Sequence, residues 1–439
     1  MSEFKLYAVS GNPIMFSQSP QIYNNLFYHF SKNAHYTRIS SSSAHESLEI
    51  GKGMKLNGLN LTSPFKEEAV PLVHEISPTS EQIQAVNLIL FRNSCLSGYN
   101  TDSYGVVQAL TTNRVSIRGK KCMVLGAGGA GRAAAHGLLK SKAAQVILVN
   151  RTKSKAKKAA YCLGCDYAPV DHIEKIIHEC DVFISCVPRL PDRFYYQKWP
   201  PNLNFLNANY KNPASTPLNK QKKINYISGL DWLLFQAFLS FRLMTGIDVS
   251  NKTKKSIQKK LMNKRNVHKS NIALIGFMGT GKTAVGRALA EKISANFLDT
   301  DQFIEDSEGL CINEIFKKKG EKKFRELEKS FIAKALPQSK NTVFSLGGGA
   351  VLDSNTVNEL RTSCHIIWLW NSLEESLKRI DLKSRPLLFG SSLSKNAQLL
   401  RSRIPHYAKA SDLVVPSPTK KIKKTAQRIK NEINQILPD

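Results

Sequence analysis

Short apolar runs alternate with longer amphipathic stretches along most of the chain, and this alternation predicts an α/β protein. The runs of strand length are residues 122–125, 145–149, 271–275, 296–298 and 342–346. Apolar residues at helical spacing follow one such run at Val285, Leu289 and Ile293. Because strands that alternate with helices usually pair in parallel, we expect parallel sheets covered by helices.

The most apolar long segment, residues 231–246, predicts a buried helix rather than a membrane span. Gln236 and Arg242 interrupt it, and it is shorter than the roughly 20 apolar residues that a bilayer requires. Residues 1–9 run into a strand-like segment without the basic start and apolar core of an export signal. We therefore expect a cytoplasmic protein with no membrane partner.

The chain of 439 residues carries a formal net charge of +29, which fits nucleic-acid binding, anionic small substrates or solvated lysine-rich faces. Lysines gather at residues 252–264 and 420–424, both on helix-like segments. The apolar stripe opposite the second group is Ile422, Ala426, Ile429, Ile433 and Ile436. Basic residues are not interleaved with aromatic ones, so we expect solvated faces and no nucleic-acid partner.

The cysteines and histidines give little indication of a metal site. Only Cys162 and Cys165 form a C-x-x-C pair, and neither a second pair nor a histidine partner at finger spacing accompanies it. Most of the eight cysteines lie in apolar runs, where a reduced thiol packs as a small hydrophobe. We expect no bound metal except the Mg²⁺ that accompanies a nucleotide.

Residues 276–283 form a complete phosphate-binding loop of the pattern G-x-x-x-x-G-K-[ST], between a predicted strand and a predicted helix. In such a loop backbone N–H groups converge on phosphate oxygens, the lysine reaches the terminal phosphates and the hydroxyl binds Mg²⁺. We therefore expect ATP and Mg²⁺ as cofactors. The residues expected to hold them are Gly276, Gly279, Thr280, Gly281, Lys282 and Thr283.

The apolar run 296–298 ends in two carboxylates, Asp299 and Asp301. Carboxylates beside bound phosphates suit the binding of Mg²⁺ and the capture of an attacking hydroxyl, although a helix N-cap with a solvated neighbour gives the same pattern. Three glycines at 347–349 follow the run 342–346, where a backbone without side chains approaches a ligand closely or simply turns. We expect Asp299, with Thr283, to be a Mg²⁺ ligand.

A second glycine motif lies between the strand 122–125 and a helical segment that ends near residue 140. Its glycines, typical of dinucleotide binding, are Gly126, Gly128, Gly129 and Gly131. The next strand ends in Asn150, Arg151 and Thr152. A carboxylate there would bind a ribose 2′-hydroxyl, whereas an arginine favours a 2′-phosphate, so we expect NADP.

Reduction of a carbonyl by hydride needs a proton source and a cation near the developing alkoxide, and Lys66 is a candidate for both. Asp102 is the candidate carboxylate that holds this lysine. Taken singly, each is more often a solvated surface residue. Ser19 and Pro20 have the character of a helix start, where hydroxyls and free N–H groups suit a substrate carboxylate.

With these motifs, the first 262 or so residues resemble shikimate dehydrogenase. The resemblance implies that Lys66 and Asp102 are the catalytic pair and that Gly229 lies near the nicotinamide. The implied substrate contacts are Ser17, Ser19, Thr62, Asn87, Tyr210 and Gln236. The departures from the family pattern are Phe16 and Tyr23 in place of usual histidines, Ser103 in place of a glycine and Asn207 in place of an aspartate.

Residues from about 268 to 439 resemble shikimate kinase through six separated motifs in one order. The resemblance implies that Asp301 is the base, that Lys282 acts on ATP, and that Arg385 in a mobile lid stabilises the transferring phosphoryl group. Arg379 is implied to contact the nucleotide. The implied substrate contacts are Arg325, Gly348, Gly349 and Arg403, for which an ordinary surface arginine or turn glycine is the alternative.

The two resemblances together predict an NADP-dependent shikimate dehydrogenase fused to a shikimate kinase. We expect 3-dehydroshikimate to be reduced to shikimate, which is then phosphorylated to 3-phosphoshikimate. The expected domains are a substrate domain (1–103 and 231–262), a Rossmann NADP-binding domain (104–230), a linker (263–269) and a P-loop kinase domain (270–439). The alternatives are other small hydroxy acids such as quinate, a basic nucleic-acid-binding protein, and a scaffold with inactive sites.

Overall fold

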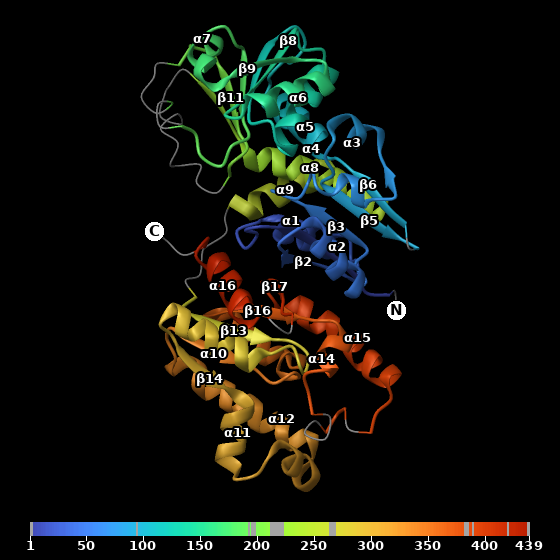
Figure 1. Ribbon diagram of the computed structural model, residues 1–439, viewed down its shortest axis with the longest axis vertical. Coiled ribbons are helices and arrows are strands. Elements are labelled where there is room, and N and C mark those ends of the chain that lie inside the picture. Colours follow the sequence, from blue (N-terminus) through green and yellow to red (C-terminus); the bar gives the residue numbers. More distant parts are fainter. Residues whose placement is uncertain are drawn as a thin grey trace.

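The computed structural model describes most of the chain as an elongated molecule of three stacked units (Figure 1). The described residues are 3–93, 95–191, 194, 199–210, 224–262, 269–381, 386–388, 390–418 and 421–436. The first strand lies in the middle unit, the central part of the sequence forms one end, and the last part forms the other (Figure 1). The middle unit is therefore built from two separate parts of the chain, one before and one after the segment that forms the first end unit.

The central part of the sequence forms the unit at one end of the molecule. This unit contains a parallel sheet of six described strands in the order β12-β11-β10-β7-β8-β9. Its strands are β7 (Lys121–Leu125), β8 (Gln145–Asn150), β9 (Asp166–Pro169), β10 (Val182–Ser185), β11 (Asn204–Asn207) and β12 (Asn225–Ser228). The crossover helices are α5 (Gly129–Lys140), α6 (Lys153–Leu163) and α7 (Ile173–Ile177). This order, which reverses between β7 and β10, is that of a nucleotide-binding Rossmann sheet.

The middle unit combines parallel and antiparallel strands around the first part of the chain. Its strands are β1 (Lys5–Gly11), β2 (Ala34–Ser40), β3 (Gly58–Leu61), β4 (Glu75–Ile76), β5 (Leu88–Arg92) and β6 (Cys95–Tyr99). Its helices are α1 (Ser19–His29), α2 (Ala44–Gly53), α3 (Pro78–Ile83) and α4 (Asp102–Thr112), joined by the returning helices α8 (Gly229–Thr245) and α9 (Asn251–Met262). Buried apolar residues of α8 pack against α1 and β1, which attaches the returning segment to the middle unit.

The last unit has a parallel sheet that begins with the strand before the phosphate loop. Its strands are β13 (Asn271–Ile275), β14 (Asn296–Asp299), β15 (Thr342–Ser345), β16 (Cys364–Trp370) and β17 (Leu413–Pro416). Its helices are α10 (Lys282–Ile293), α11 (Thr300–Glu308), α12 (Ile312–Gln338), α13 (Ser354–Ser363), α14 (Leu373–Leu377), α15 (Leu393–Ala410) and α16 (Ile422–Ile433). Non-helical backbone at Gly320 kinks α12, where φ is +78°.

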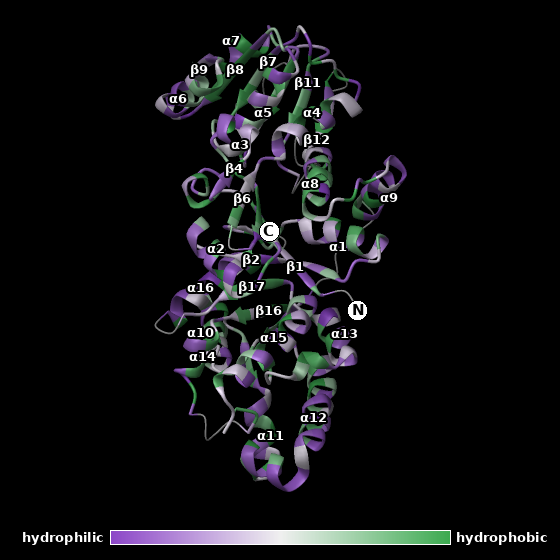
Figure 2. Ribbon diagram, turned by 90° about the vertical axis from the view of Figure 1, so that its right-hand side faces the viewer, coloured by the Kyte–Doolittle hydropathy of each residue, from purple (hydrophilic) through white to green (hydrophobic). Residues whose placement is uncertain are grey.

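The middle and last units share one continuous sheet. Val414 of β17 pairs in parallel with Ile39 of β2, so the described strands run in the order β14-β15-β13-β16-β17-β2-β1-β3-β5-β6-β4. Figure 2 shows β2 and β17 next to each other at the waist of the molecule. Buried residues on both faces of this junction, such as Leu48 with Trp370 and Ile14 with Ile433, belong to common apolar cores.

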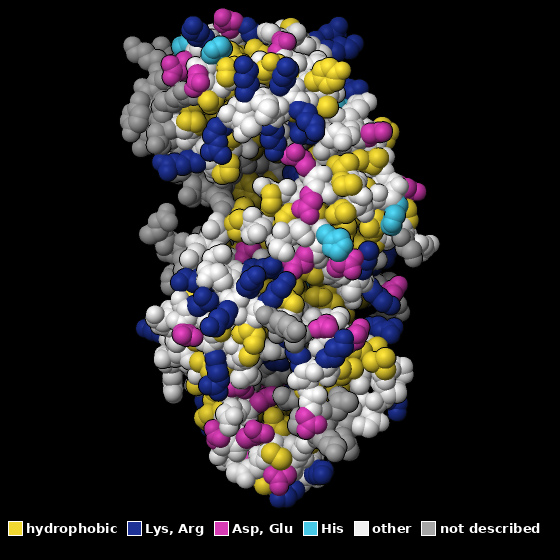
Figure 3. All heavy atoms as spheres, viewed as in Figure 1, with side chains coloured by type: hydrophobic (Ala, Val, Ile, Leu, Met, Phe, Trp, Pro, Cys, Tyr) yellow, Lys and Arg dark blue, Asp and Glu magenta, His cyan; other side chains and the backbone are white. Residues whose placement is uncertain are grey.

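The helix and strand positions expected from the apolar pattern are confirmed, with one correction on the last helix. Ala426, Ile429 and Ile433 are buried, but Ile422 is 38% exposed because it stands at the first turn, beyond the edge of the core. Among the described residues no helix is both long and apolar enough to cross a bilayer. Lys and Arg side chains are scattered over the visible face of the molecule rather than gathered in one patch (Figure 3).

Candidate active sites

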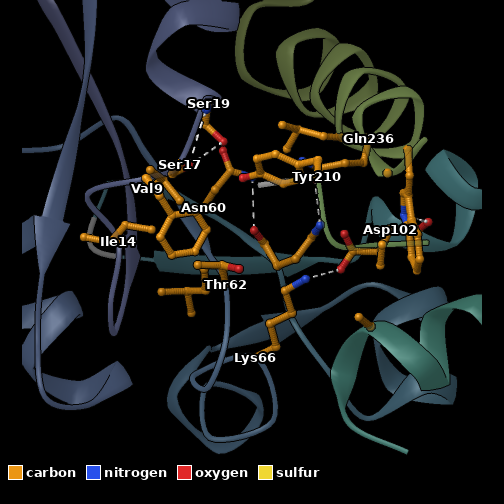
Figure 4. A pocket seen from close by; sticks show the side chains of 18 residues that line it. Val9, Ile14, Ser17, Ser19, Asn60, Thr62, Lys66, Asp102, Tyr210 and Gln236 are labelled. Carbon is orange, nitrogen blue, oxygen red and sulfur yellow. Dashed lines mark hydrogen bonds and ion pairs between the residues drawn. The ribbon is translucent and has the colours of Figure 1, made fainter. Parts of the chain in front are cut away.

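A cavity of about 160 Å³ lies where the middle unit meets the Rossmann unit. Figure 4 shows Lys66 and Asp102 on one side of it, Ser17 and Ser19 on another and Tyr210 between them. The cavity brings together these residues expected from the sequence: Ser17, Ser19, Thr62, Lys66, Asn87, Asp102, Tyr210, Gly229 and Gln236. They come from segments that are far apart in the chain, so only the fold collects them.

Lys66 and Asp102 form a short ion pair at the wall of this cavity. The Lys66 ammonium donates to Asp102 Oδ2 at 2.6 Å, and the side chains are only 14% and 8% exposed (Figure 4). Asp102 is the first residue of α4, where the positive end of the helix dipole favours a carboxylate. Trp232 donates its indole N–H to the backbone oxygen of Asp102 at 2.9 Å, a contact that no local motif predicts.

Amide and hydroxyl groups form a connected polar network beside this pair. Asn87 donates to Gln236 Oε1 at 3.1 Å and to Thr101 Oγ1 at 3.0 Å, and it accepts from the Thr101 backbone N–H at 2.8 Å. Ser240 closes the network at 2.9 Å from Thr101. Thr101 and Ser240 were not expected from the sequence. Thr101 contacts the side chains of the expected residues Asn87 and Gln236, and Ser240 supports Thr101.

Ser17, Ser19 and Tyr210 present hydroxyl groups at the other side of the cavity. Ser17 Oγ lies 3.3 Å from Ser19 Oγ, and Ser19 begins α1, with Pro20 in the first turn as expected. Removal from water raises the pKa of the Tyr210 phenol above its ordinary value, so this group remains a neutral donor at neutral pH. Neutral donors at a helix N-terminus suit a single carboxylate.

The departures from the family pattern occupy defined positions. Phe16 lines the cavity, and Tyr23 is fully buried and stacks on Tyr36 with ring centroids 4.2 Å apart. Ser103 Oγ lies 2.9 Å from His136 Nδ1, which ties α4 to α5 where the family usually has a glycine. Asn207 accepts a hydrogen bond from the backbone of Asn209 at 3.1 Å.

The glycine motif of the Rossmann unit is packed too closely for side chains. A Cβ on Gly131 would lie 1.7 Å from the carbonyl oxygen of Gly126, so the loop closes only with glycine there. The first N–H groups of an α-helix have no partner within the helix, so the start of α5 suits the pyrophosphate of a dinucleotide. Arg151 and Thr152 are exposed just beyond β8, and Asn150 accepts from Ala127 N at 3.3 Å. These residues fit NADP, with Gly128 and Gly129 completing the loop.

The phosphate loop of the last unit has the left-handed backbone that its glycines permit. The φ angles of Gly276, Gly279 and Gly281 are +147°, +78° and +84°. The Lys282 ammonium donates to the carbonyl oxygens of Gly276 and Phe277 at 3.0 and 3.2 Å. The Lys282 side chain thus bends back onto its own loop, the loop that would surround the phosphates.

Thr283 and Asp299 lie together as the expected Mg²⁺ ligands would. Thr283 Oγ1 donates to Asp299 Oδ2 at 2.7 Å, while Asp299 Oδ1 caps α11 by accepting from the backbone of Asp301 at 3.0 Å. A hydroxyl and a carboxylate are oxygen ligands of the kind that Mg²⁺ prefers. The two side chains therefore fit this cation. Asp299 is at the same time the N-cap of α11, the other role expected for it. Thr280 Oγ1 stabilises the loop itself by donating to Phe277 O at 2.8 Å.

Charged side chains approach the three glycines at 347–349 from two sides, and we call this place the crossing point. A Cβ on Gly349 would lie 2.4 Å from the Arg325 guanidinium, and one on Gly347 would lie 2.0 Å from Glu328 Oε1. Arg403 approaches Gly348 from the other side and donates to its carbonyl oxygen at 3.1 Å. Two guanidinium groups thus approach the same three glycines, and such groups suit an anionic substrate.

Two further features of this crossing point indicate an anion. Arg403 is 4% exposed, and its Nε has no hydrogen-bond partner among the residues that the structure describes. Tyr407, to which the sequence assigned no role, also donates to Gly348 O at 2.5 Å. A buried N–H without a partner is costly, so a bound carboxylate would stabilise this arrangement.

Glu328 is a buried acid that was not expected from the sequence. It is 2% exposed and forms an ion pair with Arg325 at 2.7 Å. Burial raises the pKa of Glu328, partly offset by the Arg325 charge, and the nearby Asp301 carboxylate raises it further. Its position three residues after Arg325 on α12 is the one signal that could have indicated the pair.

The remaining two arginines expected in the kinase site are Arg379 and Arg385, and the structure describes only Arg379. Arg379 donates to Ser417 O at 2.7 Å and to Gly279 O at 3.5 Å, so it lies against the phosphate loop. Arg385 lies outside the described residues.

The comparisons with known proteins agree with the two halves. The family model "Shikimate dehydrogenase substrate binding domain" matches residues 9–89, "Shikimate / quinate 5-dehydrogenase" matches 109–189 and "Shikimate kinase" matches 278–434. The shikimate dehydrogenase of Carboxydothermus hydrogenoformans is 34% identical over 265 residues, which are 56% of this chain and 93% of that protein. The shikimate kinase of Moorella thermoacetica is 44% identical over 168 residues, which are 38% of this chain and 96% of that protein.

Solved structures show the same relationship for the first part. Shikimate dehydrogenase from Aquifex aeolicus superposes with a TM-score of 0.53 at 30% identity, covering 59% of this chain and all of that one. The enzyme from Thermus thermophilus, solved with NADP(H) and shikimate, gives 0.51 at 26% identity, covering 58% and 99%. The chain therefore belongs to the shikimate dehydrogenase family over its first part and to the shikimate kinase family over its last, and is a bifunctional enzyme of the shikimate pathway.

Proposed function

We propose that the cavity around Lys66 and Asp102 reduces 3-dehydroshikimate to shikimate, and that the crossing point at residues 347–349 positions the shikimate for phosphorylation by ATP. The observation that carries the first assignment is the 2.6 Å ion pair in the wall of a cavity lined by neutral hydroxyl and amide groups. The second rests on two guanidinium groups and a phosphate loop in one unit.

In the first site each polar group has a distinct role. NADPH, when bound, supplies the hydride. Lys66 donates a proton to the carbonyl oxygen as it becomes an alkoxide, and Asp102 holds the ammonium in position. The remaining residues bind the substrate: Ser17, Ser19 and Tyr210 its carboxylate, and Thr62, Asn87 and Gln236 its ring hydroxyls.

In the second site the substrate is held by cations and backbone donors. Arg325 and Arg403 bind the carboxylate, and the N–H groups of Gly348 and Gly349 donate to the substrate. Asp301 accepts the proton of the attacking hydroxyl. ATP supplies the phosphoryl group when bound. The residues that would hold it are Gly276, Gly279, Thr280, Gly281, Lys282, Thr283 and Arg379, with Mg²⁺ on Thr283 and Asp299, and Arg385 would stabilise the transferring group.

We assign the domains as expected from the sequence: 1–103 with 231–262 for the substrate, 104–230 for NADP and 270–439 for the kinase. The direct test supplies 3-dehydroshikimate, NADPH and ATP with Mg²⁺ to the full chain. Formation of 3-phosphoshikimate is expected. Equal turnover of quinate, or no turnover of either acid, would contradict the assignment.

Cofactor choice gives a further prediction. Arg151→Ala removes a charge-assisted contact with the 2′-phosphate, which is worth about 1.5–3 kcal/mol, so the KM for NADPH should rise about 10- to 100-fold. Reduction with NADH should hardly change, because NADH lacks this phosphate. Steady-state kinetics with both cofactors measures the ratio. Parallel loss with NADH and NADPH would contradict the role of Arg151.

The glycine crossing point gives another prediction. Gly349→Ala places a methyl group 2.4 Å from the Arg325 guanidinium and should displace it, raising the KM for shikimate in the kinase reaction about tenfold or more. Gly348→Ala is the matched control, because its nearest side-chain atom lies at 3.4 Å and the expected rise is smaller. Kinase assays at varied shikimate concentration would distinguish the two. Equal effects would show that Arg325 does not depend on this close approach.

A further inference from the structure

A carboxylate of the kinase unit holds the backbone of the dehydrogenase substrate loop. Glu432, on the last helix α16, accepts hydrogen bonds at Oε2 from the backbone N–H groups of Ile14 and Met15, both at 2.8 Å. Its Oε1 accepts from Ser40 Oγ at 2.6 Å. Glu432 is 1% exposed, so these contacts satisfy a buried charge. In Figure 1, α16 lies where the last unit meets the middle unit.

The loop that Glu432 holds forms one wall of the dehydrogenase cavity. Ile14, Phe16, Ser17 and Ser19 all line that cavity. Two adjacent N–H groups bound to one oxygen fix the direction of the chain immediately before Ser17. A shift of this backbone would therefore move the hydroxyls assigned to the substrate carboxylate.

A second buried charge ties the same loop to the same junction. Arg38 of β2, 8% exposed, donates to the carbonyl oxygen of Ser17 at 2.9 Å from Nε and at 2.5 Å from Nη2. Its Nη1 donates at 3.1 Å to the backbone oxygen of Asp412, just before β17 of the kinase unit. The loop is thus held from Ile14 to Ser17 by contacts made where the two enzymes meet.

We propose that Glu432 is a positioning residue for the dehydrogenase reaction, supplied by the kinase unit. It sets the position of Ser17 and Ser19 and thereby the affinity of the first site for the substrate carboxylate. The proposal rests on the assignment of that cavity as the 3-dehydroshikimate site. In this proposal the dehydrogenase site depends on a residue of the kinase unit, so the two enzymes are not structurally independent.

The test uses the full chain with three variants of Glu432. Glu432→Ala leaves two buried N–H groups without an acceptor and should raise the KM for 3-dehydroshikimate about tenfold or more. Glu432→Gln keeps a carbonyl oxygen of the same reach and should restore the KM to within about threefold of wild type. Glu432→Asp keeps the charge but is one methylene shorter, so it should behave more like the alanine variant than the glutamine variant.

The matched control is Arg428→Ala on the same helix. Arg428 forms an ion pair with Glu46 of the dehydrogenase at 3.1 Å, across the same junction, and its Nη1 lies 3.5 Å from the backbone oxygen of Ser40. Within the described part of the chain it makes no hydrogen bond or ion pair with the loop 14–19. Its KM for 3-dehydroshikimate should equal that of wild type. In all variants the KM for NADPH and the kinase KM for shikimate should be unchanged, because the residues assigned to those ligands do not belong to the loop 14–19.

Four results would overturn the proposal. An unchanged KM in Glu432→Asp and Glu432→Ala would show that the loop holds its position alone, and an equal rise in Arg428→Ala would show a general loosening of the junction. If Glu432→Ala does not fold, an unchanged KM in Glu432→Asp alone decides against it. A wild-type chain that neither reduces nor binds 3-dehydroshikimate would overturn the assigned site as well.

Discussion

Lys66→Met should lower kcat for the reduction of 3-dehydroshikimate by about 10²- to 10⁴-fold, while phosphorylation of added shikimate continues at the wild-type rate. The variant removes both the proton donor and the cation beside the developing alkoxide. It also leaves the Asp102 carboxylate, 8% exposed, without its partner at 2.6 Å. NADPH oxidation and ADP release, measured on the same preparation, separate the two activities.

The control for this prediction is another lysine of the same unit. Lys52 forms an ion pair with Glu49 on the surface, with both side chains more than half exposed, so Lys52→Met should leave reduction unchanged. Asp102→Asn should also lose reduction, and adding it to Lys66→Met should cost little more, because the two residues act as a unit. Retained reduction in Lys66→Met would end the assignment of Lys66 as the catalytic acid.

Lys282→Ala should stop the sequence of reactions at shikimate. Its ammonium lies inside the phosphate loop, 3.0 Å from Gly276 O, and its loss should reduce phosphorylation by about 10²-fold or more. Supplied with 3-dehydroshikimate, NADPH and ATP, the variant should accumulate shikimate in an amount equal to the NADPH consumed. Product analysis by chromatography measures both.

Lys317→Ala is the matched control, because this lysine is exposed on α12 away from the loop and should not affect phosphorylation. Removal of Mg²⁺ with a chelator should reproduce the Lys282→Ala result in the wild-type chain. Formation of 3-phosphoshikimate by Lys282→Ala at the wild-type rate would contradict the kinase assignment.

The sequence alone predicted those parts of the fold and sites that depend on neighbours in the chain. The two glycine loops are recognisable because their function lies in the backbone, as the 1.7 Å approach of a Gly131 Cβ to Gly126 illustrates. The parallel sheets follow from the alternation of apolar runs and helices. The positions of Arg151 after β8 and Asp299 at the end of β14 were predictable because each follows an apolar run of strand length.

Some residues that act across long separations escaped prediction. Trp232 contacts Asp102 from 130 positions away, and Tyr407 contacts Gly348 from 59 positions away. Trp232 belongs to no short motif, and Tyr407 ends the stretch 403–407, in which the resemblance assigned a role only to Arg403. A buried tryptophan or tyrosine is ordinary in any core. Only Glu328, three residues after Arg325, left a local signal.

What only the tertiary structure decided is how the two enzymes are joined. Local patterns predicted two complete α/β units but not that Val414 of one pairs with Ile39 of the other in a single sheet. Edge strands pair through backbone N–H and C=O groups that every residue carries, so their partners cannot be recognised in a side-chain pattern. The same junction buries Glu432 against the backbone of Ile14, because complementary surfaces rather than a motif bring these groups together.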